Sequence, residues 1–343
     1  IMSHASLLPQ LRRGLSIQLK RLHAGRHNVV GSRALERFYS VVESERNDEI
    51  QETKSNSRVK DELPVTFADI SRAHVAIRNG VVRTTCEKSF FLSELIGANI
   101  YLKSEFRQFT GSFKERGVRN ALLKLSSEEA ESGVIAASAG NHALALAYHG
   151  KELGIPVTVV MPKVAPLSKV DKCRKFGSNT IIEGAHIGES QIFAEEMVKT
   201  NNLTYINGYD DPSIIAGAGT IGIELVDDVP EVDVVVVPIG GAGLIAGVSC
   251  SVKTLKPDCK VIGVEPEFCS SYIAALRAGK PTPVDVTPTL ADGLAVPTVG
   301  SNAFEVARHF VDECVSTTEK EISLAVLRLI EQEKMVVEGG GAA

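Results

Sequence analysis

Tryptophan is absent from this 343-residue chain, and aromatic residues make up only 5% of it. A nucleic-acid-binding protein would show basic stripes with aromatic residues between them. The chain has none and carries a net charge of −5, so we expect no nucleic-acid partner. Long apolar runs are also missing. The longest, 232–239, contains Asp233 and is far shorter than the about 20 residues that span a bilayer. We therefore expect no membrane-spanning segment.

The six cysteines show no C-x-x-C spacing and are scattered along the chain. This pattern indicates reduced thiols rather than a disulfide framework. The remaining composition is that of an ordinary globular protein, 44% hydrophobic and 23% charged. At about 150 residues per domain, the length predicts two domains.

The two ends of the chain differ from its middle. The first 35 residues hold no acidic residue but six Arg or Lys, with leucines every three to four positions. Such an amphipathic, Arg-rich segment is typical of a mitochondrial transit peptide; a non-native leader and a cytoplasmic protein are the alternatives. Residues 43–60 have the composition of a solvated linker, so 1–60 are expected to be leader and linker. At the other end, 336–343 predict a strand entering a Gly-rich turn with no element after it, so we expect a truncated C-terminus.

From Pro64 onward, short apolar runs alternate with helical patterns. This alternation predicts an α/β fold with parallel sheets flanked by helices, whose strands are buried on both faces. Two groups of strands indicate two sheets, with a ligand cleft between them. We expect strands at 99–105, 134–138, 157–161, 179–183, 203–207, 232–239, 261–265 and 314–316. We expect helices at 114–125, 141–153, 166–176, 188–199, 212–226, 243–255, 268–278 and 320–334.

A Gly-rich turn, Gly240-Gly241-Ala242-Gly243-Leu244, follows the most apolar of these strands. Successive backbone N–H groups at the start of a helix form an anion site suited to a phosphate. Neither G-x-G-x-x-G nor a P-loop is present, which favours one phosphate over the pyrophosphate of a nicotinamide dehydrogenase. Glycines that serve packing alone are the alternative.

Lys114 follows a small-residue loop and opens a predicted helix. The positive end of a helix disfavours an ammonium group there and would lower its pKa. A lysine that is neutral near pH 7 is what Schiff-base chemistry requires. A solvated surface lysine is the alternative.

A third strand-to-helix turn, Ser138-Ala139-Gly140-Asn141-His142, places small and polar residues at another helix start. Polar side chains and free N–H groups at such a turn can cradle a carboxylate. Ordinary N-capping by Ser138 or Asn141 is the alternative.

Together, 110–114, 138–142 and 240–244 resemble the threonine and serine dehydratases of the fold type II pyridoxal-phosphate enzymes, the tryptophan synthase β-like fold; serine racemase is a near relative. The resemblance runs from Val65 to Ala343 and includes 264–266, 291–293 and 338–339. It implies a small domain at 110–206 and a large cofactor-binding domain at 61–109 and 207–343, with the cofactor in the interdomain cleft. It also implies a homodimer or higher homo-oligomer.

The resemblance implies a role for each matching residue. Lys114 would bind pyridoxal 5'-phosphate as a Schiff base, with Phe113 beside the pyridine ring and Asn141 on the ring hydroxyl. The cofactor phosphate would lie on the loop of Gly240, Gly241, Ala242, Gly243 and Leu244, and Gly293 would lie at the cofactor edge. The substrate carboxylate would be held by Ser138, Ala139, Gly140, Asn141 and His142.

The implied reaction is β-elimination from a hydroxy amino acid. L-threonine would give 2-oxobutanoate and ammonia, and L-serine would give pyruvate and ammonia. Lys114 would take the Cα proton. Relatives carry a further segment that meets the pyridine nitrogen; without it we expect this chain to be impaired.

Departures from the family pattern leave alternatives open. Racemases usually have serine at the position of Ala139, and alanine cannot transfer a proton, so elimination is favoured over a racemase. Ala242 replaces a usual glycine and fits only at negative φ. Glu265 matches an acid of the racemase cation site, but Ser271 stands where its second acid would be, so no metal is expected. A catalytically impaired cofactor-binding paralogue is the remaining alternative.

Overall fold

The computed structural model describes residues 63–343. The predicted leader and linker lie outside the described residues. The described chain falls into two compact units, of which one contains 88–101 and the other contains 63–87 and 102–343. The first includes α4 (Phe90–Ile96), capped by the Ser89 hydroxyl and ended by Gly97 at φ 78°. Strands β1 (Cys86–Ser89) and β2 (Ile100–Lys103) form a two-stranded sheet.

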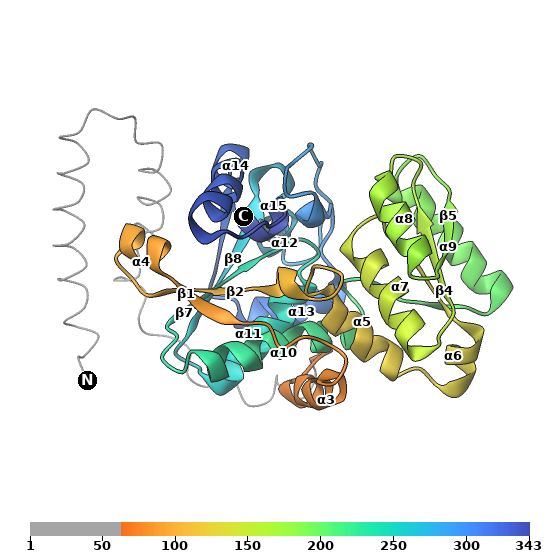
Figure 1. Cartoon of the computed structure of the whole chain (residues 1–343), viewed down its shortest axis with the longest axis horizontal. Coiled ribbons are helices and arrows are strands. Elements are labelled where there is room, and N and C mark those ends of the chain that lie inside the picture. The colour runs from red at the N-terminus through yellow and green to blue at the C-terminus, as the bar shows by residue number, and fades with distance from the viewer. Residues whose placement is uncertain (1–62) are drawn as a thin grey trace. The chain divides into compact units, whose positions relative to one another are not determined.

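A four-stranded parallel sheet has the order β5-β4-β3-β6 and appears in yellow and green in Figure 1. Alternate residues of its strands pack on opposite faces. Val134 and Ala136 join the core formed with α7, whereas Ile135 and Val160 pack against Ala194 of α9. The strands are β3 (Val134–Ala137), β4 (Val157–Met161), β5 (Asn179–Ile182) and β6 (Thr204–Tyr205). The helices are α6 (Ser127–Ser132), α7 (Asn141–Leu153), α8 (Leu167–Lys175) and α9 (Ile187–Asn201).

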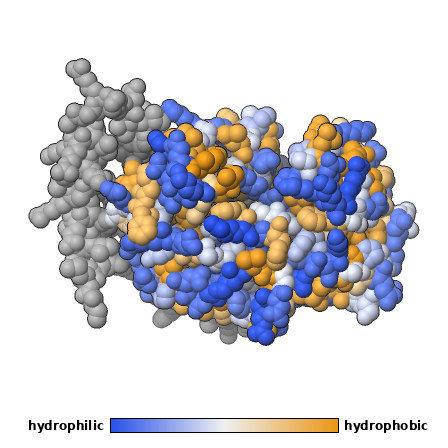
Figure 2. All heavy atoms as spheres, viewed as in Figure 1, coloured by the Kyte–Doolittle hydropathy of each residue, from blue (hydrophilic) through white to orange (hydrophobic). Residues whose placement is uncertain are grey.

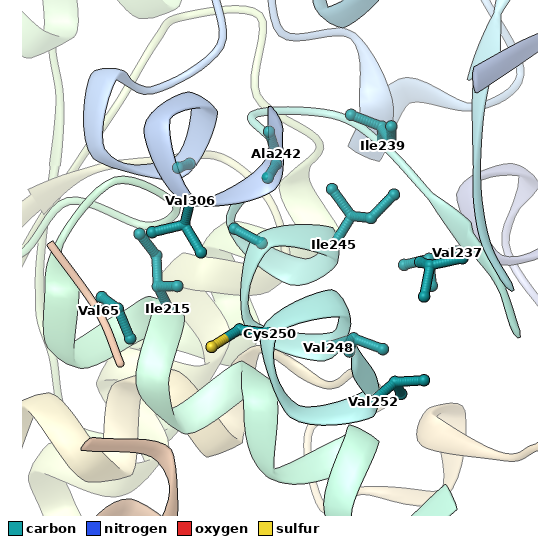
Figure 3. Packing of buried hydrophobic residues seen from close by; sticks show 14 of the residues in the cluster. Val65, Ile215, Val237, Ile239, Ala242, Ile245, Val248, Cys250, Val252 and Val306 are labelled. Carbon is teal, nitrogen blue, oxygen red and sulfur yellow. The ribbon is translucent and has the colours of Figure 1, made fainter. Parts of the chain in front are cut away.

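A three-stranded parallel sheet, β7-β8-β9, is packed against helices on its inner face. In Figure 3, Ile245 and Val248 of α11 face Val237 of β7. Val234 and Val236 on the other face are 40% and 54% exposed, so the expectation of burial on both faces is wrong for this strand. The strands are β7 (Val234–Pro238), β8 (Lys260–Pro266) and β9 (Glu313–Thr317). The helices of this part are α3 (Phe67–Ile77), α10 (Pro212–Asp228), α11 (Gly243–Leu255), α12 (Ser271–Ala278), α13 (Ser301–Phe310) and α14 (Glu319–Arg328).

Glycines allow α5 (Lys114–Leu123), α10 and α11 to pack very closely. A Cβ on Gly117 of α5 would lie 2.8 Å from the Ile214 carbonyl oxygen of α10. A Cβ on Gly247 of α11 would lie 2.4 Å from the Ile215 carbonyl oxygen and 2.6 Å from the Gly219 nitrogen. The three helices therefore touch through their backbones.

The predicted strands and helices are present, most of them with shifted ends, and the α/β class with parallel sheets is confirmed. The helix expected at 320–334 ends at Arg328 and continues as a π-helical turn, Leu329–Glu333. The strand and Gly-rich turn expected within 336–343 are wrong, because no strand is present there and the Gly-rich stretch forms a short helix, α15 (Gly339–Ala342). Helices α3, α4, α6 and α13 and strand β1 were not anticipated.

The surface seen in Figure 2 mixes hydrophilic and hydrophobic residues. Within residues 63–343, no helix combines the length and apolar character needed to cross a membrane.

Candidate functional site

Lys114 is the first residue of α5, as predicted. Its Nζ donates a hydrogen bond to the Gly208 carbonyl oxygen at 2.6 Å and lies 5.2 Å from the centre of the Phe113 ring. Burial lowers the pKa of this amine from 10.5 to about 8. The expected direction is therefore present, but its cause is desolvation rather than the helix terminus invoked from the sequence. With this pKa, about a tenth of the Lys114 amine is neutral at pH 7, far more than for an ordinary lysine.

The Ser138–His142 turn connects β3 to α7, and Asn141 is the first residue of that helix. The residue before it, Gly140, makes no side-chain cap, and the Ser138 hydroxyl accepts from the Gly140 N–H at 3.3 Å. The capping interpretation of Ser138 and Asn141 is therefore wrong. A Cβ on Gly140 would meet no described heavy atom within 4 Å, so this turn borders open space.

The Asn141 side chain is oriented by two charged neighbours. Its Nδ2 donates to Glu338 Oε1 at 2.6 Å, and its Oδ1 accepts from Lys169 Nζ at 3.2 Å. If the amide were flipped, its Nδ2 would face the Lys169 ammonium and its Oδ1 would face the Glu338 carboxylate. These two neighbours therefore fix the orientation of the amide. A Cβ on Gly293 would lie 3.7 Å from the same Glu338 oxygen. Glu338 thus lies next to both Asn141 and Gly293. No role for Glu338 was predicted from the sequence.

His142 is buried, and its Nε2 is 3.0 Å from the Ile206 carbonyl oxygen. A carbonyl only accepts, so Nε2 carries the proton, and Nδ1 is buried without a partner among the described residues. Burial, and then the positive charge of Lys114, lower the pKa of this imidazole to about 4. His142 is therefore neutral at physiological pH.

The Gly-rich turn ends at α11, which begins at Gly243. The residue before it, Ala242, is buried and has φ 70°, so the expectation of a negative φ is wrong. A Cβ on Gly241 would lie 2.3 Å from the Tyr209 ring, and one on Gly243 would lie 2.2 Å from the Tyr209 carbonyl oxygen. Packing thus demands glycine at both positions, while the turn still presents the N-terminus of a 13-residue helix.

The neighbours of this turn include another predicted site residue. A Cβ on Gly240 would lie 3.2 Å from the Gly293 carbonyl oxygen, so these two predicted residues are adjacent. Leu244 is half-buried and packs on the core of the three-stranded sheet. The Gly241 carbonyl accepts a hydrogen bond from the Gly300 N–H at 3.1 Å, which ties the turn to α13.

The segment 206–210, which follows β6, connects all three turns. The Asn207 side chain accepts hydrogen bonds from the Tyr209 and Asp210 N–H groups and so shapes the loop. Ile206 contacts His142, Gly208 contacts Lys114, and Tyr209 packs on the Gly-rich turn. Sequence reasoning missed this loop. The Asn-Gly pair indicates a turn, but the sequence holds no sign of its partners.

Arg116, two residues after Lys114, anchors α5. Its fully buried guanidinium binds Glu105 and Glu224 with two hydrogen bonds each, all between 2.7 and 2.8 Å. Lys103 adds a 2.8 Å ion pair to Glu224. These charges lower the pKa of Glu224 against the opposing effect of burial. The network fixes the helix that carries Lys114.

Glu265, which matches an acid of the racemase cation site, has a structural role at the start of α12. Its buried carboxylate accepts the Tyr272 and Ile273 N–H groups at 2.7 and 2.9 Å, which caps α12. Burial raises its pKa to about 7. Over 63–343, no three His, Cys, Asp or Glu side chains gather as a metal site would need. Ser271, at the position of the second acid, has a buried hydroxyl with no partner in the described part of the chain.

These residues fit pyridoxal phosphate. Lys114 offers a desolvated amine, and the Gly-rich turn offers backbone N–H groups suited to its phosphate. Asn141, whose Nδ2 has a second proton besides the one given to Glu338, can donate to a ring hydroxyl. The Nδ1 of buried His142, which has no hydrogen-bond partner within residues 63–343, adds a free polar atom near Lys114.

Comparison with known proteins indicates the same cofactor. Residues 77–343 match the family model described as pyridoxal-phosphate dependent enzyme. An L-threonine ammonia-lyase from Thermotoga maritima is 48% identical over 278 residues, covering 81% of this chain and 69% of that protein. A catabolic L-threonine dehydratase from Staphylococcus aureus is 41% identical over 279 residues, covering 81% of both.

Solved structures give the same result. A processed threonine deaminase from Solanum lycopersicum superposes with a TM-score of 0.78 at 36% identity, covering 80% of each chain. A serine racemase from Dictyostelium discoideum superposes with a TM-score of 0.77 at 33% identity, covering 81% of this chain and 90% of that one. The fold type II architecture is thereby established, and the chain belongs to the family of pyridoxal-phosphate-dependent enzymes.

Proposed function

We propose that this protein is a threonine ammonia-lyase, a lyase that converts L-threonine to 2-oxobutanoate and ammonia and L-serine to pyruvate and ammonia. The observation that carries the proposal is the desolvated amine of Lys114 on the Gly208 carbonyl, next to the Ser138–His142 turn. The 48% and 41% identity to proteins named for threonine deamination supports the same substrate class.

Residues of the three turns have different roles in the proposed reaction. Bound pyridoxal phosphate supplies an electron sink for the charge that develops at the substrate Cα. Backbone N–H groups of 240–244 at the start of α11 hold its phosphate, and Asn141 donates to its ring hydroxyl. The Ser138–His142 turn holds the substrate carboxylate and so orients the Cα–H bond. Lys114, with a pKa of about 8, accepts that proton as general base near neutral pH.

Ala139 favours elimination over the racemase alternative. Racemisation requires a second group that returns a proton to the opposite face of Cα. Alanine has no proton to give, and Ala139 lies within the turn that would hold the substrate carboxylate. The serine racemase similarity is therefore interpreted as shared fold and cofactor.

The test compares the full chain with Lys114→Ala, using Lys124→Ala at the other end of α5 as the matched control. Keto-acid and ammonia formation from L-threonine and L-serine is measured, together with the absorption band of the lysine–cofactor Schiff base. We expect Lys114→Ala to lose the band and to lower kcat/KM by about 100-fold or more, the size of a general-base contribution, while Lys124→Ala retains both.

The outcomes separate the alternatives. Undiminished keto-acid formation by Lys114→Ala would refute the assignment. Formation of D-serine without ammonia would identify a racemase. A Schiff-base band without any product would identify an impaired cofactor-binding paralogue.

We make three further proposals, which concern the domain boundaries, the oligomeric state and the localisation. The small domain comprises 110–206 and the large domain 61–109 with 207–343, as the family pattern implies. The protein forms a homodimer or higher homo-oligomer. The Arg-rich leader within 1–60 directs it to mitochondria. Limited proteolysis, sedimentation and import assays test these in turn.

A further inference from the structure

The His142 ring lies directly on the residue that binds the Lys114 amine. A Cβ on Gly208 would lie 2.7 Å from His142 Cγ and 2.9 Å from Cδ2, closer than real side chains approach. The carbonyl of this same Gly208 accepts the hydrogen bond from Lys114 Nζ at 2.6 Å. The His142 imidazole therefore packs on Gly208, and the Gly208 carbonyl in turn accepts the hydrogen bond from the Lys114 amine.

The ring is itself held in place. His142 Nε2–H donates to the Ile206 carbonyl at 3.0 Å, two residues before Gly208. Asn207 fixes the same loop by accepting the Tyr209 and Asp210 N–H groups at 3.0 and 2.9 Å. His142 thus contacts one short loop at two points, through a hydrogen bond at Ile206 and a face contact at Gly208.

A role in packing alone does not explain why residue 142 is a histidine. His142 is 7% exposed, and its Nδ1 has no hydrogen-bond partner among the described residues. A buried polar atom left unpaired is costly, and a simple apolar side chain would avoid that cost. Imidazole combines a flat face for Gly208 with a donor for Ile206, which no apolar residue offers.

We propose that His142 is a positioning residue for Lys114. By holding Ile206 and pressing on Gly208, it fixes the carbonyl that receives the Lys114 amine whenever that amine is not bound to the cofactor, and it keeps water from the amine. This inference rests on the proposed function, in which Lys114 is the general base. It assigns to His142 the role of keeping the Lys114 amine in place between turnovers.

The test measures the accessibility and titration of Lys114 in the full chain stripped of cofactor. Competitive acetylation with acetic anhydride, followed by peptide mass spectrometry, gives the midpoint at which the Lys114 amine becomes reactive. Wild-type protein is expected to titrate near a pKa of about 8. In His142→Ala, water reaches the amine, and we expect the midpoint to rise by about one unit or more toward an ordinary lysine.

Two further variants separate positioning from general destabilisation. His142→Gln keeps a side-chain N–H donor that can reach Ile206, and its midpoint should stay near that of the wild type. His309→Ala, at an exposed histidine of α13, is the matched control and should change nothing. Thermal unfolding of each variant confirms that it is folded.

The face contact has its own test. In Gly208→Ala the new methyl meets the imidazole, so the thermal midpoint should fall and the Lys114 titration should shift. The double variant His142→Ala/Gly208→Ala removes the clash and should recover most of the thermal midpoint, but not the wild-type Lys114 titration, because the Ile206 contact is lost.

The proposal is overturned if folded His142→Ala titrates Lys114 as the wild type does, or if His142→Gln behaves like His142→Ala. The result is distinguishable from failure of the proposed function. Absence of a Schiff base and of keto acid in the wild type would refute the function while leaving the acetylation result intact.

Discussion

Ala242 carries backbone strain at the start of α11. Its φ of 70° lies in the left-handed region, where a residue with a Cβ costs roughly 1–2 kcal/mol. The side chain is only 2% exposed and belongs to the core around Ile245 and Val306, as Figure 3 shows. Burial of this methyl contributes about 0.8 kcal/mol. The strain and the burial therefore nearly offset one another.

Replacing this alanine with glycine should accordingly change stability little. Ala242→Gly relieves the strain but loses the methyl contact, so we expect a change in unfolding free energy within about 1 kcal/mol. Ala246→Gly, one turn into the same helix and equally buried, should cost about 1–2 kcal/mol because it gains no strain relief. Urea denaturation checks both. Equal losses would show that the left-handed alanine is unstrained.

At the scale of an element, α12 depends on an acid that lies outside it. The Glu265 carboxylate at the end of β8 accepts two N–H groups of the first turn of α12. The Cys314 thiol on β9 donates to the same carboxylate over 3.8 Å. Burial nevertheless outweighs these bonds and raises its pKa from 4.5 to about 7. The start of α12 is thus coupled to the protonation of Glu265, which occurs between mildly acidic and neutral pH.

This coupling predicts a pH-dependent stability. A raised pKa means that the folded state favours the protonated acid, so the stabilisation is complete below pH 4.5 and is lost as the pH rises through about 7. Glu265→Gln cannot titrate. The stability of the wild type relative to this variant should therefore decline as the pH increases over that window, as measured by denaturant unfolding. His142, whose lowered pKa gives the opposite trend, is common to both proteins. Parallel pH curves would contradict the prediction.

At the scale of the whole unit formed by 63–87 and 102–343, backbone contacts between helices set the spacing of the site. Helix α5 begins with Lys114, α11 begins beside the Gly-rich turn, and α10 packs against both. Gly117 and Gly247 permit these contacts because a side chain at either would meet the backbone of α10. The separation between the amine and the phosphate turn therefore depends on residues that touch neither.

A methyl group at this contact should disturb both stability and binding. In Gly247→Ala the new Cβ meets Ile215 and Gly219 backbone atoms, and such overpacking costs about 1–3 kcal/mol. We expect a lower denaturation midpoint and weaker pyridoxal-phosphate binding, measured by urea unfolding and by titration of the cofactor absorbance. Gly341→Ala, where the nearest atom lies 3.8 Å away, should leave stability unchanged. A neutral Gly247→Ala would show that the helices can separate freely.

Much of the molecule could be predicted because it depends on local pattern. Val157–Met161 and Asn141–Leu153 were expected with the boundaries that the structure has, since an apolar run and a turn residue define each. The three turns were found from Gly, Asn and Lys at helix starts. Helices α3 and α13 were missed, and so was the exposed face of β7, because burial depends on which partners arrive from distant sequence.

The sequence by itself determined the α/β class and the family, and it predicted Lys114, Asn141 and the Gly-rich turn as parts of the site. Each depends on residue type and on neighbours a few positions away. Only the tertiary structure decided what surrounds them: the Gly208 carbonyl on Lys114, the His142 ring on Gly208, Glu338 on Asn141, and the burial that lowers the lysine pKa. These contacts join residues up to 197 positions apart, and a local sequence pattern holds no information about such a distance.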